Sequence, residues 1–173
     1  MRHPLLAGAL LLASCGYRAM HAPGGREHFA VVLSASQIPD GVAADEVVAG
    51  VRDELTRLDA FAGGDAYPRC EIEVLRADEA SEGIGAAANA DGVELPDARA
   101  TQVALVARAW IVRTKDGPRE RDTGDVRAVT TVGVAPDART GTFRHVDALR
   151  AVGRRVGRRV GLRVLGVPTA SDE

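Results

Sequence analysis

Residues 101–113 place the strongest constraint on how this chain folds. They alternate apolar side chains on both sides of an extended backbone. Val103, Leu105, Ala107, Ala109 and Ile111 would share one face, and Ala104, Val106, Trp110 and Val112 the other. A strand that is apolar on both faces is normally buried on both. We therefore expect this strand to be central in its sheet, or partly covered on its second face.

The rest of the chain supplies partners for that strand. Alternating apolar residues predict further strands, and apolar residues at helical spacing predict two helices. We expect strands at residues 28–35, 67–76 and 121–134, and helices at residues 43–60 and 143–165. A loop is expected at residues 137–141. Residues 78–99 are expected to form a long surface loop or the tip of an extended hairpin.

These elements predict an α+β fold in the order β-α-β-β-β-α. The simplest assembly is a four-stranded, mostly antiparallel sheet with two helices packed on one face. The first strand and helix are also compatible with a right-handed crossover to a parallel neighbouring strand. We expect a single domain at residues 28–167, followed by a carboxy-terminal tail at residues 168–173.

The amino terminus contains a short apolar run that ends at a cysteine. Arg2 and His3 precede the apolar residues 4–13, which span about half of the roughly 20 residues that a membrane-spanning helix needs. Leucines followed by Ala13-Ser14-Cys15 resemble the lipobox of bacterial lipoproteins, in which a peptidase cuts before the cysteine and lipid is attached to it. The alternative is an ordinary cleaved signal peptide in which the cysteine has no special role.

The lipobox resemblance implies where the mature protein resides. We expect a lipoprotein signal peptide at residues 1–14, lipidation with palmitate-type chains at Cys15, and a lipidated tether at residues 15–27. Gly16 stands where an aspartate would retain an enterobacterial lipoprotein in the inner membrane. The resemblance therefore favours a lipid anchor in the outer membrane, with the domain on the periplasmic side.

The second cysteine and the charge distribution add two expectations. With Cys15 lipidated, Cys70 would have no disulfide partner, and its alternation with Ile72 and Val74 indicates a small core residue.

Residues 15–100 hold 16 acidic and 7 basic residues, whereas residues 101–173 hold 14 basic and 8 acidic ones. We expect the attraction between the two halves to help dock one against the other.

The last predicted helix carries a repeat of glycine and arginine. Gly153, Gly157 and Gly161 recur every fourth residue, and each costs a helix about 1 kcal/mol relative to alanine. Close packing of this glycine stripe against the sheet would compensate. The candidate site for lipopolysaccharide or other anions is the set Arg150, Arg154, Arg155, Arg158, Arg159 and Arg163. The alternatives are a solvated face balanced by the acidic half, or nucleic-acid binding, which the lack of aromatic stacking residues disfavours.

No pattern of residues indicates catalysis or a bound cofactor. The sequence lacks a nucleophile elbow, a phosphate-binding loop and a zinc-protease motif. Its histidines are scattered without metal-ligand spacing, and the faint glycine pattern at residues 83–88 follows an acidic segment rather than a clear βαβ unit. We therefore expect a protein that is not an enzyme, with no cofactor and no metal.

With this layout, the chain resembles the lipopolysaccharide-assembly lipoprotein family LptE. The match is carried by Cys15-Gly16-Tyr17-Arg18 and by the order of a tether, a strand, an amphipathic helix, three strands and a long last helix. Leu33-Ser34-Ala35-Ser36 departs from the family, which often has a Phe-x-Asn-like element there. The resemblance implies a non-enzymatic partner of an LptD-like outer-membrane β-barrel that binds lipopolysaccharide, and no nucleic acid.

A different class of accessory lipoprotein fits the same features. These are the auxiliary subunits of lipid-transport ABC systems, secretin pilots and activators of envelope enzymes. All are anchored α/β domains that act through a protein partner. The sequence alone does not separate them from the LptE-like alternative.

Overall fold

The computed structural model describes residues 27–88, 90–92, 94–133, 135 and 137–168. Its elements are β1 (Ala30–Ser36), α1 (Gly41–Arg57), β2 (Arg69–Ala88), β3 (Glu94–Val112), β4 (Arg119–Glu120), β5 (Val126–Gly133) and α2 (Ala138–Val164). The predicted signal peptide, Cys15 and nearly all of the predicted tether lie outside the described residues. Within the described residues, neither helix has the length and hydropathy needed to cross a membrane.

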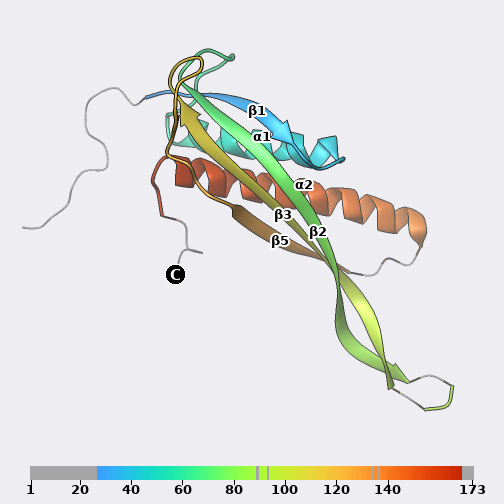
Figure 1. Ribbon diagram of the computed structural model, residues 1–173. Coiled ribbons are helices and arrows are strands. Elements are labelled where there is room, and N and C mark those ends of the chain that lie inside the picture. Colours follow the sequence, from blue (N-terminus) through green and yellow to red (C-terminus); the bar gives the residue numbers. More distant parts are fainter. Residues whose placement is uncertain (1–26, 89, 93, 134, 136, 169–173) are drawn as a thin grey trace, which may run out of the picture.

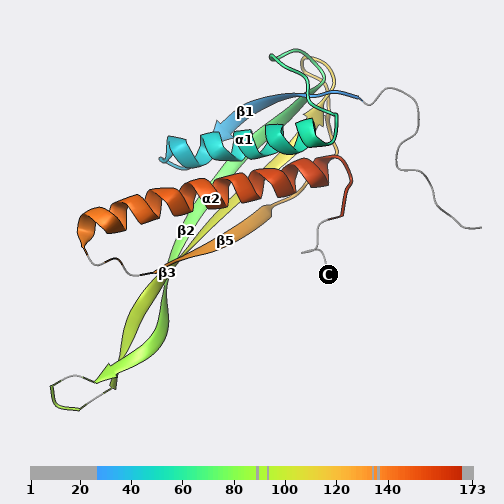
Figure 2. The ribbon, with the colours of Figure 1, turned by 180° about the vertical axis from the view of Figure 1, so that it is seen from behind.

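The strands form one sheet, and both helices lie on the same face of it (Figures 1 and 2). β1 and β2 are parallel, whereas β3 is antiparallel to β2, β4 and β5. The α+β fold with two helices on one face is therefore confirmed, and so is the crossover from β1 to a parallel neighbour. The two-residue strand β4 adds a fifth strand to the four that the sequence predicts.

β3 is the central strand, as its apolar composition predicts. It is hydrogen-bonded to β2 along one edge and to β4 and β5 along the other. Val103, Leu105 and Ile111 on its helix-covered face are fully buried, and Trp110 on the other face is 1% exposed. The helices contribute the buried side chains Val47, Val51, Leu55, Val152, Val156, Val160 and Val164. Burying each large aliphatic side chain stabilises a fold by roughly 1.5–3 kcal/mol, so this apolar layer holds the domain together.

Two predicted boundaries are wrong, one at the start of α2 and one at the start of the fourth predicted strand. The expected loop at residues 137–141 is the first turn of α2, because the Asp137 side chain accepts a hydrogen bond from the Thr140 amide at 2.9 Å. The strand expected at residues 121–134 begins later, at Val126, and forms β5. Arg121 and Gly124 adopt left-handed backbone conformations, with φ of 50° and 61°, and these interrupt the pairing.

Residues 78–99 form an extended hairpin, the second of the two structures expected for them. β2 and β3 pair from Arg69 opposite Val112 to Ala88 opposite Glu94, with register shifts after Val74 and around Gly83. β1 ends at Ser36 opposite Val74, and β5 ends at Gly133 opposite Ala100. Beyond these points β2 and β3 pair only with each other. We call residues 82–98 the hairpin arm, and Figure 1 shows it projecting away from the body.

The glycine stripe packs against α1, and the expectation that it packs against the sheet is wrong. A Cβ at Gly153 would lie 2.8 Å from the Ala43 carbonyl oxygen, and one at Gly157 would lie 2.9 Å from the Gly50 Cα and closer still to the Val47 carbonyl oxygen. The two helices are parallel, since later residues of α2 meet later residues of α1. This backbone-to-backbone approach is what compensates for the weak helix propensity of glycine.

Candidate functional site

The six candidate arginines of α2 divide into two groups, and the first group covers an edge of the sheet. Arg155 Nη1 donates to the Val129 carbonyl oxygen at 2.7 Å, and Arg159 Nη1 donates to the Arg127 carbonyl oxygen at 2.8 Å. Arg163 Nη1 lies 3.4 Å from the Thr123 carbonyl oxygen. Arginines four apart on the helix thus meet backbone carbonyl oxygens at successive points along β5 and just before it. These bonds occupy backbone acceptors that an edge strand would otherwise expose.

The second group faces outward between the two helices. Arg154 forms ion pairs with Glu46 at 2.8 Å and with Asp53 at 3.4 Å, both on α1. Arg150 pairs with Asp147 at 3.1 Å, one turn earlier on α2. Arg158 is exposed and makes no hydrogen bond or ion pair with any described residue. Its five N–H donors are therefore open to a ligand.

An open depression of about 590 Å³ brings part of this set together. It is lined by Glu46, Asp147, Arg150, Ala151, Arg154, Arg155 and Arg158. Four of the six predicted anion-binding arginines therefore meet at one place, whereas Arg159 and Arg163 do not line it. The two carboxylates offset part of the positive charge, so Arg158 and Arg155 are the residues best placed to receive an anion.

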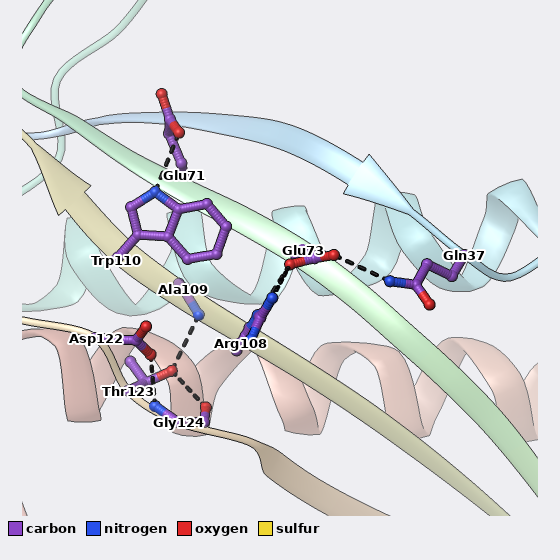
Figure 3. A network of polar contacts seen from close by, with 9 residues as sticks. All are labelled: Gln37, Glu71, Glu73, Arg108, Ala109, Trp110, Asp122, Thr123 and Gly124. Atoms are coloured by element: carbon purple, nitrogen blue, oxygen red, sulfur yellow. Dashed lines mark hydrogen bonds and ion pairs between the residues drawn. The ribbon is translucent and has the colours of Figure 1, made fainter. Parts of the chain in front are cut away.

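The face of the sheet without helices carries a polar network that the sequence does not reveal (Figure 3). Trp110 Nε1 donates to Glu71 at 3.1 Å, and Arg108 donates to Glu73 at 2.7 Å from Nη2. Glu71 and Glu73 lie opposite Trp110 and Arg108 in the register of β2 and β3. The hydrogen bond from Arg108 is the main reason why the pKa of Glu73 is lowered.

Ion pairs link the acidic and basic halves of the chain, as their opposite charges predict. Arg108 pairs with Glu73, and Arg154 pairs with Glu46. Arg113 pairs with Glu27 of the acidic half, and it also pairs with Glu120 of its own half at 2.8 Å. The groups involved are partly exposed, so each pair contributes modestly to stability. The halves are docked mainly by the shared core and only secondarily by charge.

Cys70 is a core residue, as predicted, and we expect it to be chemically inert. It is fully buried on β2, and burial raises the pKa of its thiol to about 12. The thiolate population at pH 8 is then very small. A thiol reagent should label Cys70 in native protein at pH 8 no faster than the protein unfolds, and rapidly in 6 M guanidinium as a control. Stoichiometric labelling within seconds in native buffer would contradict this.

The described residues contain no group of three or more potential metal ligands. His28 lies 3.8 Å from Asp59, and His145 on α2 lies 3.4 Å from Glu79 on β2. Within the described part of the chain, the geometry therefore offers contacts for a partner or an anion, and it assembles no recognisable catalytic group.

No protein-family model and no curated protein matches this sequence. Several solved structures do resemble it. A candidate lipoprotein from Caulobacter crescentus CB15 is 12% identical over 76% of this chain and 86% of that chain, with a TM-score of 0.51. The minor lipoprotein from Acinetobacter baumannii is 11% identical over 82% of this chain and 93% of that chain, with a TM-score of 0.52.

A third resemblance is weaker. The rare lipoprotein B from Shewanella oneidensis is 9% identical over 79% of this chain and 91% of that chain, with a TM-score of 0.39, which is too low to establish a common fold. The first two structures show the fold alone, because their sequence identity to this chain is low. The chain thus has an α+β fold that is also found in bacterial lipoproteins.

Proposed function

We propose that this chain is a lipid-anchored, non-enzymatic accessory protein of the bacterial envelope. Like LptE-like proteins, it would assist lipopolysaccharide assembly beside an outer-membrane β-barrel. The lipobox at Cys15 and the fold shared with lipoproteins support the anchored class. The observation that carries the proposal is the depression where Arg150, Arg154, Arg155 and Arg158 meet.

Guanidinium groups suit the phosphates of lipopolysaccharide. Each presents a planar set of donors that can bind a phosphate through two parallel hydrogen bonds. Arg158 has all of its donors available, and Arg155 uses only Nη1 on the sheet edge. Arg150 is held by an exposed ion pair with Asp147, which an incoming phosphate can replace at small cost. Arg154, Arg159 and Arg163 would mainly hold the helix in place.

We expect Arg158→Glu to weaken lipopolysaccharide binding by about tenfold or more, because a charge-assisted hydrogen bond contributes about 1.5–3 kcal/mol. Binding of the purified full-length protein to lipopolysaccharide would be measured by fluorescence displacement. Arg127→Glu is the matched control, since it makes the same charge change at an exposed position on β5. If the two variants bound lipopolysaccharide with equal affinity, the depression would not be the binding site.

The partner is tested separately by crosslinking in native membranes. Capture of a lipopolysaccharide-exporting β-barrel supports the LptE-like role. Capture of an ABC permease, a secretin or a peptidoglycan synthase in its place would assign the protein to another class of accessory lipoprotein.

A further inference from the structure

The amino-terminal part of α2 runs past the start of α1 and leaves an aromatic side chain uncovered (Figures 1 and 2). Gly153 of α2 already meets Ala43 in the first turn of α1, so about three turns of α2 extend beyond that helix. Phe143 lies in this extension and is 61% exposed, more than any other large apolar side chain in the described part of the chain. Single exposed apolar side chains are common, so Phe143 matters only together with its neighbours.

Phe143 stands at one end of the row of arginines that lines the depression. Arg139, one turn before it, places its guanidinium carbon 5.9 Å from the centre of the phenyl ring. The positions that follow are three or four residues apart, so they share one face of the helix. We call this face the outward stripe of α2, and it comprises Arg139, Phe143, Asp147, Arg150, Arg154 and Arg158. The stripe thus combines one aromatic ring with a series of basic groups.

The surface around the stripe remains positive after the carboxylates that line it or pair with it are counted. Asp147 lies on the stripe itself, and Glu46 and Asp53 reach it from α1 by pairing with Arg154. Against these three carboxylates stand the arginines at positions 139, 150, 154, 155 and 158. The excess of two positive charges complements an anionic surface. Near an anionic bilayer, each uncompensated basic residue strengthens binding about fivefold.

The proposed anchor lies within reach of this surface. The Phe29 amide bonds to the Ala60 carbonyl oxygen just after α1, and Gly161 of α2 lies beside Glu54 near the same end of α1. The chain therefore enters the domain near the carboxy-terminal end of α2 (Figure 1). The twelve residue steps from Cys15 to Glu27 span at most about 43 Å, and the 27 residues of α2 are about 40 Å long. An anchored molecule can thus lie with the outward stripe along the bilayer.

We propose that the outward stripe of α2 docks on the anionic phospholipid surface of the membrane that holds the anchor. Phe143 enters the boundary between head groups and acyl chains. Arg139, Arg150 and Arg158 bind lipid phosphates, because their aliphatic stems can lie along apolar surface while the guanidinium groups stay polar. Two excess charges and one ring bind weakly, but an anchored domain meets the surface at high effective concentration. The contact therefore sets the orientation of the domain; it rests on the proposed anchor at Cys15 and needs no lipopolysaccharide.

A fluorescent label that responds to polarity tests this contact in the full-length, lipidated protein. Ala151→Cys places the label among the arginines at an exposed position without changing the charge. Ala80→Cys is the matched control, because Ala80 is exposed on β2 next to Glu79, which faces α2, and so lies on the face without helices. Cys70 is buried, so the new cysteine is labelled selectively.

The labelled proteins are reconstituted into phosphatidylcholine vesicles with or without about a third of phosphatidylglycerol. With phosphatidylglycerol, the label at residue 151 should shift to shorter wavelength and brighten about twofold or more, and the label at residue 80 should not change. Phe143→Ala should remove at least about half of the response, whereas Leu33→Ala, at an exposed apolar position on β1, should preserve it. No response at residue 151, an equal response at residue 80, or a response without phosphatidylglycerol would overturn the docking.

Flotation of the same vesicles separates failure of the docking from failure of the proposed anchor. Protein that floats with pure phosphatidylcholine vesicles but shows no response to phosphatidylglycerol has its anchor and lacks the contact, which overturns the docking. Protein that floats only with vesicles containing phosphatidylglycerol has the contact without the anchor, which supports the docking and contradicts the anchor. The vesicles contain no lipopolysaccharide, so the proposed binding of that ligand is tested independently.

Discussion

Gly157→Ala is expected to lower the free energy of unfolding by about 2–4 kcal/mol. The new methyl group would lie 2.9 Å from the Gly50 Cα and from the Val51 amide nitrogen, and closer to the Val47 carbonyl oxygen. These are backbone atoms, so no side-chain rotation relieves the overlap and the helices must separate. The gain in helix propensity is only about 1 kcal/mol. Urea unfolding followed by circular dichroism measures the difference.

Gly141→Ala is the matched control for that substitution. Gly141 lies in the same helix, and its added Cβ would meet only the Ala135 side chain at an ordinary 3.6 Å. We expect this variant to be as stable as the wild type or up to about 1 kcal/mol more stable. A Gly157→Ala protein that matched the stability of Gly141→Ala would show that the two helices are not in backbone contact.

Trp110→Ala is expected to reduce the free energy of unfolding by about 3–5 kcal/mol. Trp110 is 1% exposed although no helix covers its face of the sheet. The Arg119 guanidinium lies 3.8 Å from its ring centroid, and its Nε1 donates to Glu71. Removing the indole would open a cavity and leave the Glu71 carboxylate without that donor. Circular dichroism must follow this unfolding, because Trp110 is the sole tryptophan.

Two further variants separate burial from the hydrogen bond. Trp110→Phe should recover most of the stability, because a ring still fills the site. Glu71→Gln should cost less than about 1.5 kcal/mol, since the amide oxygen can accept the same hydrogen bond. A loss below 1 kcal/mol for Trp110→Ala would mean that this face of the sheet is open to water.

Local periodicity was sufficient to predict the main elements and the face that each one buries. Val47, Val51 and Leu55 on α1, like Cys70 and Ile72 on β2, are buried as their spacing predicts. Each of these patterns can be recognised from the residues of a single segment. The start of α2 was missed because its capping residue, Asp137, precedes polar and small residues without apolar spacing. The late start of the fourth strand is not predicted, because a left-handed conformation at Arg121 has no signal in the sequence.

The site was harder to predict because its geometry depends on the neighbours of α2. Six arginines within residues 150–163 indicate an anion site, but α2 runs beside the edge of β5. That arrangement directs Arg155, Arg159 and Arg163 to backbone carbonyl oxygens. The glycine stripe was correctly expected to allow a close approach, yet its partner is α1. The whole fold determines which helices and strands lie side by side. The spacing of residues within one segment does not predict these neighbours.

We propose that the domain acts from a membrane to which Cys15 anchors it. Mass spectrometry of the amino-terminal peptide, from protein purified out of native membranes, tests this most directly. The predicted result is a peptide that begins at Cys15 and carries the added mass of lipid on its sulfur and amino group, with Cys15→Ser protein unprocessed or released to the periplasm. A mature peptide that begins elsewhere, or an unmodified Cys15, would contradict the account.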